Sequence, residues 1–376
     1  IPLMKRTGYR PAYAGAVEAA ASTGGEIMPP IMGAAAFIMA EIIGVSYISI
    51  CKAAILPALL YFTAVFVSTH IEAVKLGLKG LSRTEIPDFK ETVYGGFHFI
   101  VPIFLLIFIL IRGFTPFRAA FMAIIALMVV AMARKSSRLN LSEFFQALIA
   151  GARNAVVIAS CCACAGIVVG CLDSTGLGLK FVDIITALSR GVFPALLLLV
   201  MVACLILGMG VPTAPAYIIS AMVAAPALIK AGLTPISAHM FVFYSCLLSA
   251  ITPPVALAAY AGAAIAEADV MKTGLQASKL GFVKFLVPYV FAYNAALLIM
   301  GSPGFVVLSF ATAFTGTVML SAAIEGFLFT SMSTPTRAVF AIGSVMLLIS
   351  GILTDILGAI VLAIGLLANY RSSKAI

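Results

Sequence analysis

Residues 11–43 read PAYAGAVEAAASTGGEIMPPIMGAAAFIMAEII, and residues 235–268 read PISAHMFVFYSCLLSAITPPVALAAYAGAAIAEA. Each stretch is apolar, yet each holds a Pro-Pro pair in its middle, at 29–30 and 253–254. A proline inside a helix removes a backbone donor and clashes with the preceding turn, at a cost of about 3 kcal/mol or more. Each half, about 15 residues long, is also shorter than the roughly 20 residues that a crossing helix needs. The sequence therefore predicts two re-entrant hairpins, 11–43 and 235–268, whose turns are buried in protein or line a watery cavity.

The rest of the chain has the composition of a membrane protein. Of its 376 residues, 63% are hydrophobic and only 10% are charged, and the mean hydropathy is +1.17. A soluble domain cannot hide that much apolar surface, so a soluble enzyme and a disordered chain are excluded. The net charge of +9 comes from basic residues between apolar runs, which excludes a nucleic-acid-binding module. We predict an all-α polytopic protein of the cell (inner) membrane, in contact with lipid.

Long apolar runs mark the expected membrane spans. A further segment, 176–190, carries charges at helical spacing and is predicted to be an amphipathic helix at the membrane surface. The clear spans are 50–69, 97–112, 114–133, 154–172, 192–208, 281–300, 303–322 and 350–369. Two weaker candidates are 214–231 and 337–349.

The two proline-interrupted stretches belong to an internal repeat. Pro11, Pro29 and Pro30 match Pro235, Pro253 and Pro254 at one offset of 224 residues. A lysine and then a proline follow in each copy, at 52 and 57 and at 284 and 288. Repeated halves with broken elements are typical of secondary transporters, whose halves we expect to be inverted. The predicted organisation is a first repeat over 1–140, a second repeat over 141–300, and a C-terminal transmembrane extension over 301–376.

A third interruption, Gly208 to Thr213, lies between two apolar runs just ahead of the second proline-interrupted stretch. Glycine frees the backbone and proline removes a donor, so we expect the helix to unwind there and to expose carbonyl oxygens. Unwound carbonyls and nearby hydroxyls are a common way for a membrane protein to hold Na⁺ without a cage of carboxylates.

The motifs of these segments resemble the large membrane subunit of TRAP transporters. The similarity is carried by ASTGGEIMPPIMGAAAF at 21–37, SAITPPVA at 249–256 and the broken helix 208–213, and it is greatest to the fused permeases of the TAXI branch. It covers about residues 1–300, and the tail 301–376 is similar to the C-terminal extension of those permeases. Because the family pattern begins before Ile1, the resemblance implies that this chain is the C-terminal part of a longer protein.

The resemblance implies an elevator-type, Na⁺-coupled uptake system. An extracytoplasmic solute-binding protein of the TAXI type would deliver an organic acid, usually a carboxylate, and a small four-helix membrane subunit or its fused N-terminal equivalent would complete the permease. The coupling ion would be Na⁺. The residues implied as Na⁺ ligands are Ser22, Thr23, Gly24, Gly25, Pro29, Gly208, Gly210, Thr213, Ser249, Thr252 and Pro254.

The substrate is expected at the same broken elements, near Ser22, Thr23, Glu26, Thr213 and Thr252. Glu26 is singled out because a charge at bilayer depth is costly and must face a cavity or pair. No basic residue lies inside either proline-interrupted tip, so a carboxylate would need helix N-termini, hydroxyls or a basic residue from elsewhere in the fold.

Three other functions remain open at this stage. A binding-protein-independent Na⁺/dicarboxylate symporter would share the broken elements. A membrane-embedded enzyme would need clustered nucleophiles and bases within the spans, which the three scattered histidines do not provide. A channel would have no need of two matched interrupted elements.

Overall fold

The computed structural model describes residues 1–82, 84–133, 137–349 and 351–374. These residues form helices joined by short loops, with one isolated β-bridge between Phe327 and Ser331. The helices are α1 (Pro2–Thr7), α2 (Pro11–Gly25), α3 (Ala34–Ile43), α4 (Tyr47–Lys75), α5 (Phe89–Gly96), η1 (Phe97–Phe99), α6 (Ile100–Ile111), α7 (Pro116–Ala133), α8 (Leu141–Thr175), α9 (Leu177–Ser189), α10 (Phe193–Gly208), α11 (Thr213–Lys230), α12 (Pro235–Leu248), α13 (Leu257–Ala266), α14 (Val270–Leu280), α15 (Phe282–Tyr293), η2 (Ala295–Leu298), α16 (Pro303–Glu325), α17 (Thr334–Leu348) and α18 (Ile352–Lys374).

Seven helical stretches in the described residues are long and apolar enough to cross a membrane, which confirms an all-α polytopic membrane protein. They cover most of the spans predicted from the sequence, and the last begins just after residue 350, which lies outside the described residues. The seven are Tyr47–Lys75, Phe89–Ile111, Pro116–Ala133, Leu141–Thr175, Thr213–Lys230, Pro303–Glu325 and Ile352–Arg371.

Three predicted spans are not among these seven. Two of them, 192–208 and 337–349, correspond to the shorter apolar helices Phe193–Gly208 and Thr334–Leu348. The third prediction is wrong. The stretch 281–300 is not one helix, because α15 ends at Tyr293 and a separate short helix, η2, follows. The side chain of Asn294 accepts a hydrogen bond from the backbone N–H of Ala296 at 3.0 Å and donates one to the Ser309 hydroxyl at 3.0 Å. An asparagine that caps a new helix start offers the backbone an alternative to continuing the old one.

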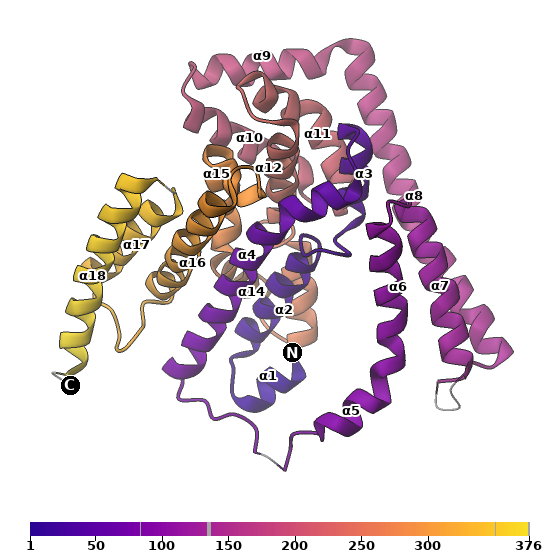
Figure 1. Cartoon of the computed structure of the whole chain (residues 1–376), viewed down its shortest axis with the longest axis horizontal. Helices are drawn as coiled ribbons and strands as arrows, with labels where there is room; N and C mark the ends of the chain where they lie inside the picture. Colours follow the sequence, from indigo (N-terminus) through magenta and orange to yellow (C-terminus); the bar gives the residue numbers. More distant parts are fainter. Residues whose placement is uncertain (83, 134–136, 350, 375–376) are drawn as a thin grey trace.

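The prediction of a hairpin over 11–43 is also wrong. The arms of a hairpin pack side by side, but α2 and α3 lie end to end, and the chain passes along α4 in one direction (Figure 1). Three tyrosine hydroxyls record this direction by donating to backbone carbonyls: Tyr13 to Ser68 (3.1 Å), Tyr61 to Ala20 (2.7 Å) and Tyr47 to Ile31 (2.8 Å). As the chain advances from residue 13 to residue 31, its partner on α4 recedes from residue 68 to residue 47.

The stretch 235–268 follows the same rule. Here α12 and α13 lie end to end, and α14 and α15 run back along both. The partners again recede along the chain. The rings of Phe241 and Tyr244 pack on Tyr289 and Phe291 of α15, Ile251 accepts a hydrogen bond from Ser278 of α14, and Pro253 lies against Gly274, nearer the start of α14. The prediction of a second hairpin at 235–268 is therefore wrong, and both stretches are interrupted helices that continue in one direction.

The physical reason is the summed length of the two halves. Neither half is long enough to cross a membrane alone, because α2 has 15 residues and α3 has 10. A proline pair interrupts the helical hydrogen bonds but does not reverse the chain. Placed in series, α2 with 15 residues and α3 with 10 exceed the roughly 20 residues that a crossing needs, even without the unwound link between them.

A helical hairpin that reaches one of the breaks is formed instead by α10 and α11. These two helices pack against each other and both pack on α12. Their turn, 209–212, lies beside the second proline pair, because the Ser249 hydroxyl bonds the Gly208 carbonyl at 2.9 Å. From there α11 returns along α12, and the Tyr217 hydroxyl meets His239 Nδ1 at 2.7 Å. The interruption predicted at 208–213 is thus the tip of a hairpin.

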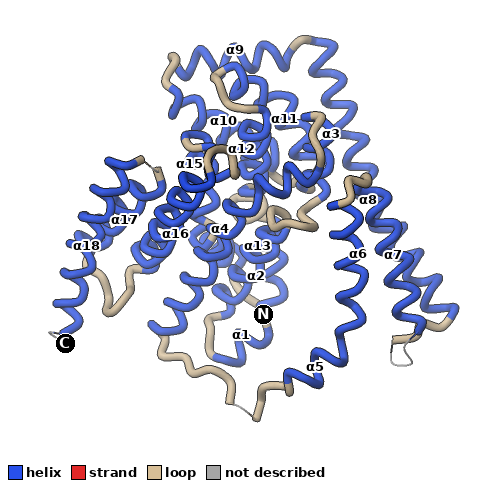
Figure 2. The backbone as a smooth tube through the Cα atoms, in the orientation of Figure 1, coloured by secondary structure: helices blue, strands red, loops and turns tan. Residues whose placement is uncertain are grey.

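The two interrupted helices run in opposite directions. Gly15 of α2 lies against Gly262 of α13, and Lys5 Nζ donates to the carbonyl of Ala266 at 2.8 Å, so the end of α13 meets the start of α2. Figure 2 shows α13 beside α2. The halves of the repeat are therefore inverted with respect to each other in these elements.

The helices divide into a packed centre and a more exposed periphery. α4 and α11 are mostly buried, whereas α6, α7 and α8 expose most of their apolar side chains. Figure 1 shows α6, α7 and α8 along one side and α16, α17 and α18 on the other, with α9 crossing one end. The predicted amphipathic segment 176–190 is α9, a helix that buries only part of its surface.

Candidate functional site

The first break follows the end of α2. The Thr23 hydroxyl turns back into the helix and donates to the carbonyls of Ala19 and Ala20, at 3.0 and 3.1 Å. Gly24 is buried against the ring of Tyr61, and a Cβ there would come within 2.6 Å of that ring. The close packing of α2 on α4 at this point therefore requires glycine.

A buried lysine reaches the same break from the other half of the repeat. Lys284 lies on α15 and has no exposed surface. Its Nζ donates to the carbonyl of Thr23 at 3.1 Å and lies 5.0 Å from the centre of the Tyr61 ring. Lys284 was noted in the sequence only as a landmark of the repeat, and its place beside the first break is decided by the packing of α15.

The second break faces the hairpin tip. The buried hydroxyl of Ser249 donates to the carbonyls of Gly208 (2.9 Å) and Cys246 (2.7 Å), which brings α10 onto the end of α12. A Cβ on Gly208 would lie 2.8 Å from that hydroxyl oxygen, so the approach depends on glycine. Gly210 has a φ of +74°, the left-handed region that glycine tolerates.

The predicted site residues thus fall into two groups. One lies at the first break and the other at the hairpin tip and second break. Within the first group Thr23 and Gly24 are buried, Glu26 and Pro29 half-buried, and Ser22 and Gly25 exposed. Within the second, Gly208 and Ser249 are buried, Thr213 and Thr252 half-buried, and Gly210 and Pro254 exposed. The Ser22 hydroxyl donates to Glu18 and the Thr252 hydroxyl to Leu248, so both serve their own helix.

Neither proline-interrupted tip contains a basic residue in the sequence. The fold, however, brings two lysines from other helices to the first break. One is Lys284, and the other is its counterpart in the repeat, Lys52. Lys52 is exposed and lines a cavity of about 410 Å³ together with Pro29 and Pro30. The rest of the lining of that cavity is apolar, and Lys52 is the one charged residue in it.

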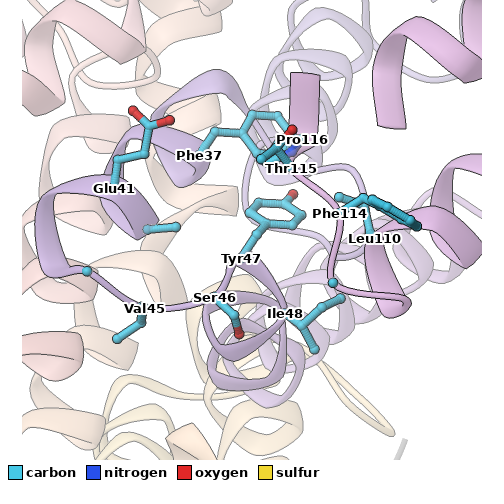
Figure 3. A pocket seen from close by; sticks show the side chains of 13 residues that line it. Phe37, Glu41, Val45, Ser46, Tyr47, Ile48, Leu110, Phe114, Thr115 and Pro116 are labelled. Atoms are coloured by element: carbon cyan, nitrogen blue, oxygen red, sulfur yellow. The ribbon is translucent and has the colours of Figure 1, made fainter. Parts of the chain in front are cut away.

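A second cavity, of about 350 Å³, lies between the start of α4 and the turn from α6 to α7 (Figure 3). Its labelled polar groups are Glu41, Ser46, Tyr47 and Thr115. The Tyr47 hydroxyl donates to the carbonyls of Pro30 and Ile31, which links this cavity to the first break.

The oxygen atoms at the second break suit a hard cation such as Na⁺. Carbonyls and hydroxyls of Gly208, Ser249 and Thr252 are the kind of ligand that such ions prefer. Within the described residues, no three His, Cys, Asp or Glu side chains gather closely enough to hold a metal ion. An ion bound at the second break would therefore depend on backbone and hydroxyl oxygens.

Inverted interrupted helices, a helical hairpin at a break and seven potential spans define a membrane transport protein. The chain belongs to the family described as tripartite ATP-independent periplasmic transporter, DctM component, whose model matches residues 1–304. No curated protein matches the chain.

Membership of this family settles the general class. The chain is the large permease component of a TRAP secondary transporter, a multi-pass inner-membrane protein and not an enzyme. Permeases of this family normally work with a solute-binding protein and a small membrane subunit. The C-terminal helices α17 and α18 lie beyond the matched region, and α16 begins at its end.

Proposed function

We propose that this permease couples uptake of an organic acid, a carboxylate, to Na⁺. The observation that carries the proposal is the meeting of the α10–α11 tip with the second break, where Ser249 bonds Gly208. Broken elements of this kind present unwound carbonyls to coupling ions in secondary transporters. The proposed ligands are oxygens of Gly208, Gly210, Thr213, Ser249, Thr252 and Pro254.

The substrate is proposed to bind between the two breaks, near Ser22, Thr23, Glu26, Thr213 and Thr252. Lys52, the one charged residue in the lining of the cavity at Pro29 and Pro30, supports an anionic substrate. Lys52 would balance the negative charge of Glu26 on approach of a carboxylate. A solute-binding protein of the TAXI type is proposed to deliver it, with a small four-helix subunit or its fused equivalent beside the permease.

An elevator movement is proposed for the transport step. The densely packed centre, with α2, α4 and α11–α15, would move as one body against the more exposed α6, α7 and α8. α6 touches α4 only lightly, which supports a boundary there, whereas α8 packs against α11, so this contact would have to slide during the movement. Alternating access of this kind rests on rigid-body displacement of one bundle against another around a fixed site.

Uptake into proteoliposomes tests the proposal. The full-length permease, with its membrane subunit, is reconstituted and supplied with radiolabelled carboxylates, an inward Na⁺ or choline gradient, and purified binding protein. Uptake that needs both Na⁺ and the binding protein supports the proposal. Na⁺-driven uptake without the binding protein would instead indicate a binding-protein-independent symporter, and equal uptake in choline would refute Na⁺ coupling.

A further inference from the structure

Lys284 is a buried cation that the transport scheme above does not use. Its side chain has no exposed surface, and the residues around it on α15 belong to the hydrophobic core. An ammonium removed from water is costly unless the protein supplies compensating partners. The partners of Lys284 therefore indicate what the first break is built to hold.

The groups around the Lys284 ammonium are of the kinds that bind cations. The Thr23 carbonyl, in the last turn of α2, accepts a hydrogen bond from Lys284 Nζ at 3.1 Å. The C-terminal end of a helix carries partial negative charge and favours cations. The face of Tyr61, 5.0 Å from the ammonium, adds a cation–π contact, and Glu26, the residue that caps α2, places a carboxylate at the same helix end.

Two carbonyls of the preceding turn of α2 accept hydrogen bonds from neutral hydroxyls. The carbonyl of Ala20 accepts from the Tyr61 hydroxyl at 2.7 Å and from the Thr23 hydroxyl at 3.1 Å. The carbonyl of Ala19 accepts from Thr23 as well. The one charged donor at the end of α2 in the described contacts is Lys284, which comes from the opposite half of the repeat.

The second break differs in its donors. There the carbonyls of Gly208 and Cys246 accept from the neutral hydroxyl of Ser249. Lys52, the counterpart of Lys284 in the repeat, is exposed and lines the outer cavity. The two breaks share one sequence pattern, yet a lysine is buried at the first and a serine hydroxyl serves the second.

We propose that the Lys284 ammonium is a tethered cation that occupies the end of α2 in place of a Na⁺ ion. The inference rests on the proposed Na⁺ coupling and narrows it: exchangeable Na⁺ binds at the second break, and the first break carries its own positive charge. The hydrogen bond from Lys284 to Thr23 also holds the first break against α15. The two halves of the repeat therefore stay in contact while Na⁺ binds to and dissociates from the second break.

Counting bound Na⁺ tests the proposal directly. The full-length permease with its membrane subunit is equilibrated with ²²Na⁺, for wild type, Lys284→Met and the control Lys272→Met. Lys272 is an exposed lysine on α14. We expect Lys284→Met to bind one more Na⁺ per protein than wild type, because the Thr23 carbonyl and Glu26 lose their ammonium. Lys272→Met should match wild type.

A second variant guards against loss of folding. The double variant Lys284→Met/Glu26→Gln removes both charges. No uncompensated carboxylate is then left at the end of α2, so this variant should not bind the additional Na⁺. Folding of each variant is checked by monodispersity and by thermal unfolding. If folded Lys284→Met binds the same number of Na⁺ as wild type, or if the double variant keeps the additional ion, the tethered cation is refuted.

Transport measurements separate this inference from the proposed function. Wild-type uptake that is equal in Na⁺ and choline would refute the coupling, whatever Lys284 does. If wild-type uptake is Na⁺-driven, we expect Lys284→Met to lose at least about ten-fold in uptake at low Na⁺ and to regain part of it at high Na⁺. A rate and a Na⁺ dependence equal to wild type would overturn the role of Lys284 while leaving the coupling intact.

Discussion

The contact between Ser249 and Gly208 shows how single residues shape the proposed ion site. The serine hydroxyl holds two carbonyls from different helices, and it reaches Gly208 because that residue has no Cβ. Neither residue carries charge, so the pair orients oxygen atoms without adding a fixed negative charge in the membrane. The arrangement is suited to an ion that must also be released.

Replacing Ser249 with alanine should weaken Na⁺ binding without unfolding the protein. Loss of one hydroxyl that orients two carbonyls is worth about 1–1.5 kcal/mol, or about a ten-fold rise in the Na⁺ concentration for half-maximal uptake. Ser245→Ala is the matched control, because Ser245 is equally buried and bonds only the Phe241 carbonyl of its own helix. An equal effect of both substitutions would argue against an ion at Ser249.

Glu85, in the loop after α4, supports a prediction about pH. The hydroxyl and backbone N–H of Ser82 hydrogen-bond its carboxylate and hold its pKa below the usual range, with a smaller contribution from Arg6. A lowered pKa means that the contact stabilises the loop above the pKa of the unfolded chain and is lost as pH falls through the folded value. The protection of the Ser82 amide against hydrogen exchange should therefore fall in acid.

The control for this prediction is Glu85→Gln. Glutamine does not titrate, so protection of the Ser82 amide in that variant should change with pH only as the intrinsic exchange rate does. A wild-type amide whose protection factor stays constant down to acid pH would contradict the assignment.

At the scale of elements, the central contact is the crossing of α2 and α13. Their backbones approach at Gly15 and Gly262, where a Cβ on Gly15 would lie 2.8 Å from the Gly262 carbonyl oxygen. Small residues allow membrane helices to approach closely and gain van der Waals contact. This crossing joins the inverted helices, and it fixes their relative direction.

Gly15→Ala should destabilise the permease by about 1–3 kcal/mol, because the new methyl group meets backbone that cannot move aside. Gly166→Ala on α8 is the control, since the space around Gly166 is open and alanine is the better helix former. Thermal unfolding in detergent measures both. A Gly15→Ala variant as stable as Gly166→Ala would show that the two helices do not approach so closely in the membrane.

Labelling of cysteines distinguishes an interrupted crossing from a hairpin. In a background without native cysteines, Thr7→Cys and Ser46→Cys flank the α2–α3 element. If the element crosses, an impermeant maleimide should label them from opposite sides of the membrane. Val192→Cys and Ala231→Cys flank α10–α11 and should be labelled from one side. Labelling of Thr7→Cys and Ser46→Cys from the same side would restore the hairpin first predicted from the sequence.

At the scale of the whole molecule, buried charges attach the C-terminal helices to the centre. Glu325, at the end of α16, has a fully buried side chain and pairs with Lys279 of α14 at 2.6 Å. Lys75 of α4 donates to the Glu325 backbone carbonyl at 3.2 Å and pairs with Glu72 at 3.4 Å. One acidic residue on α16 therefore joins α4 and α14.

A double-mutant cycle on Lys279 and Glu325 should show strong coupling. The Glu325 side chain is fully buried, whereas Lys279 is 34% exposed. Lys279→Gln leaves the buried carboxylate uncompensated, so it should cost several times more than the about 0.2–1 kcal/mol of an exposed pair, and Glu325→Gln should cost less. The exposed pair Arg6–Glu85 serves as the comparison on the same chain. Coupling energies of equal size in the two cycles would mean that α16 is not held by this contact.

Much of the protein follows from the sequence. Its apolar fraction places it in a membrane, the repeated prolines mark both breaks, and their motifs indicate the TRAP family, which the family match over 1–304 confirms. These features are local: helical hydrogen bonding fails at Pro29-Pro30 and Pro253-Pro254 whatever surrounds them. Their type and spacing can therefore be predicted from the chain alone.

The path of the chain after each break was decided by tertiary structure. A proline pair stops a helix but leaves the next direction open, and packing along α4 and along α14–α15 carries α3 and α13 onward instead of back. The same holds for the first break, where Lys284, 261 residues from Thr23 in the chain, supplies the ammonium. The sequence by itself determined where the helices break, because that is a matter of local hydrogen bonding. Only the tertiary structure determined at which breaks the chain reverses. It also determined which side chain donates a hydrogen bond to the carbonyls freed at a break, because both depend on contacts between distant segments.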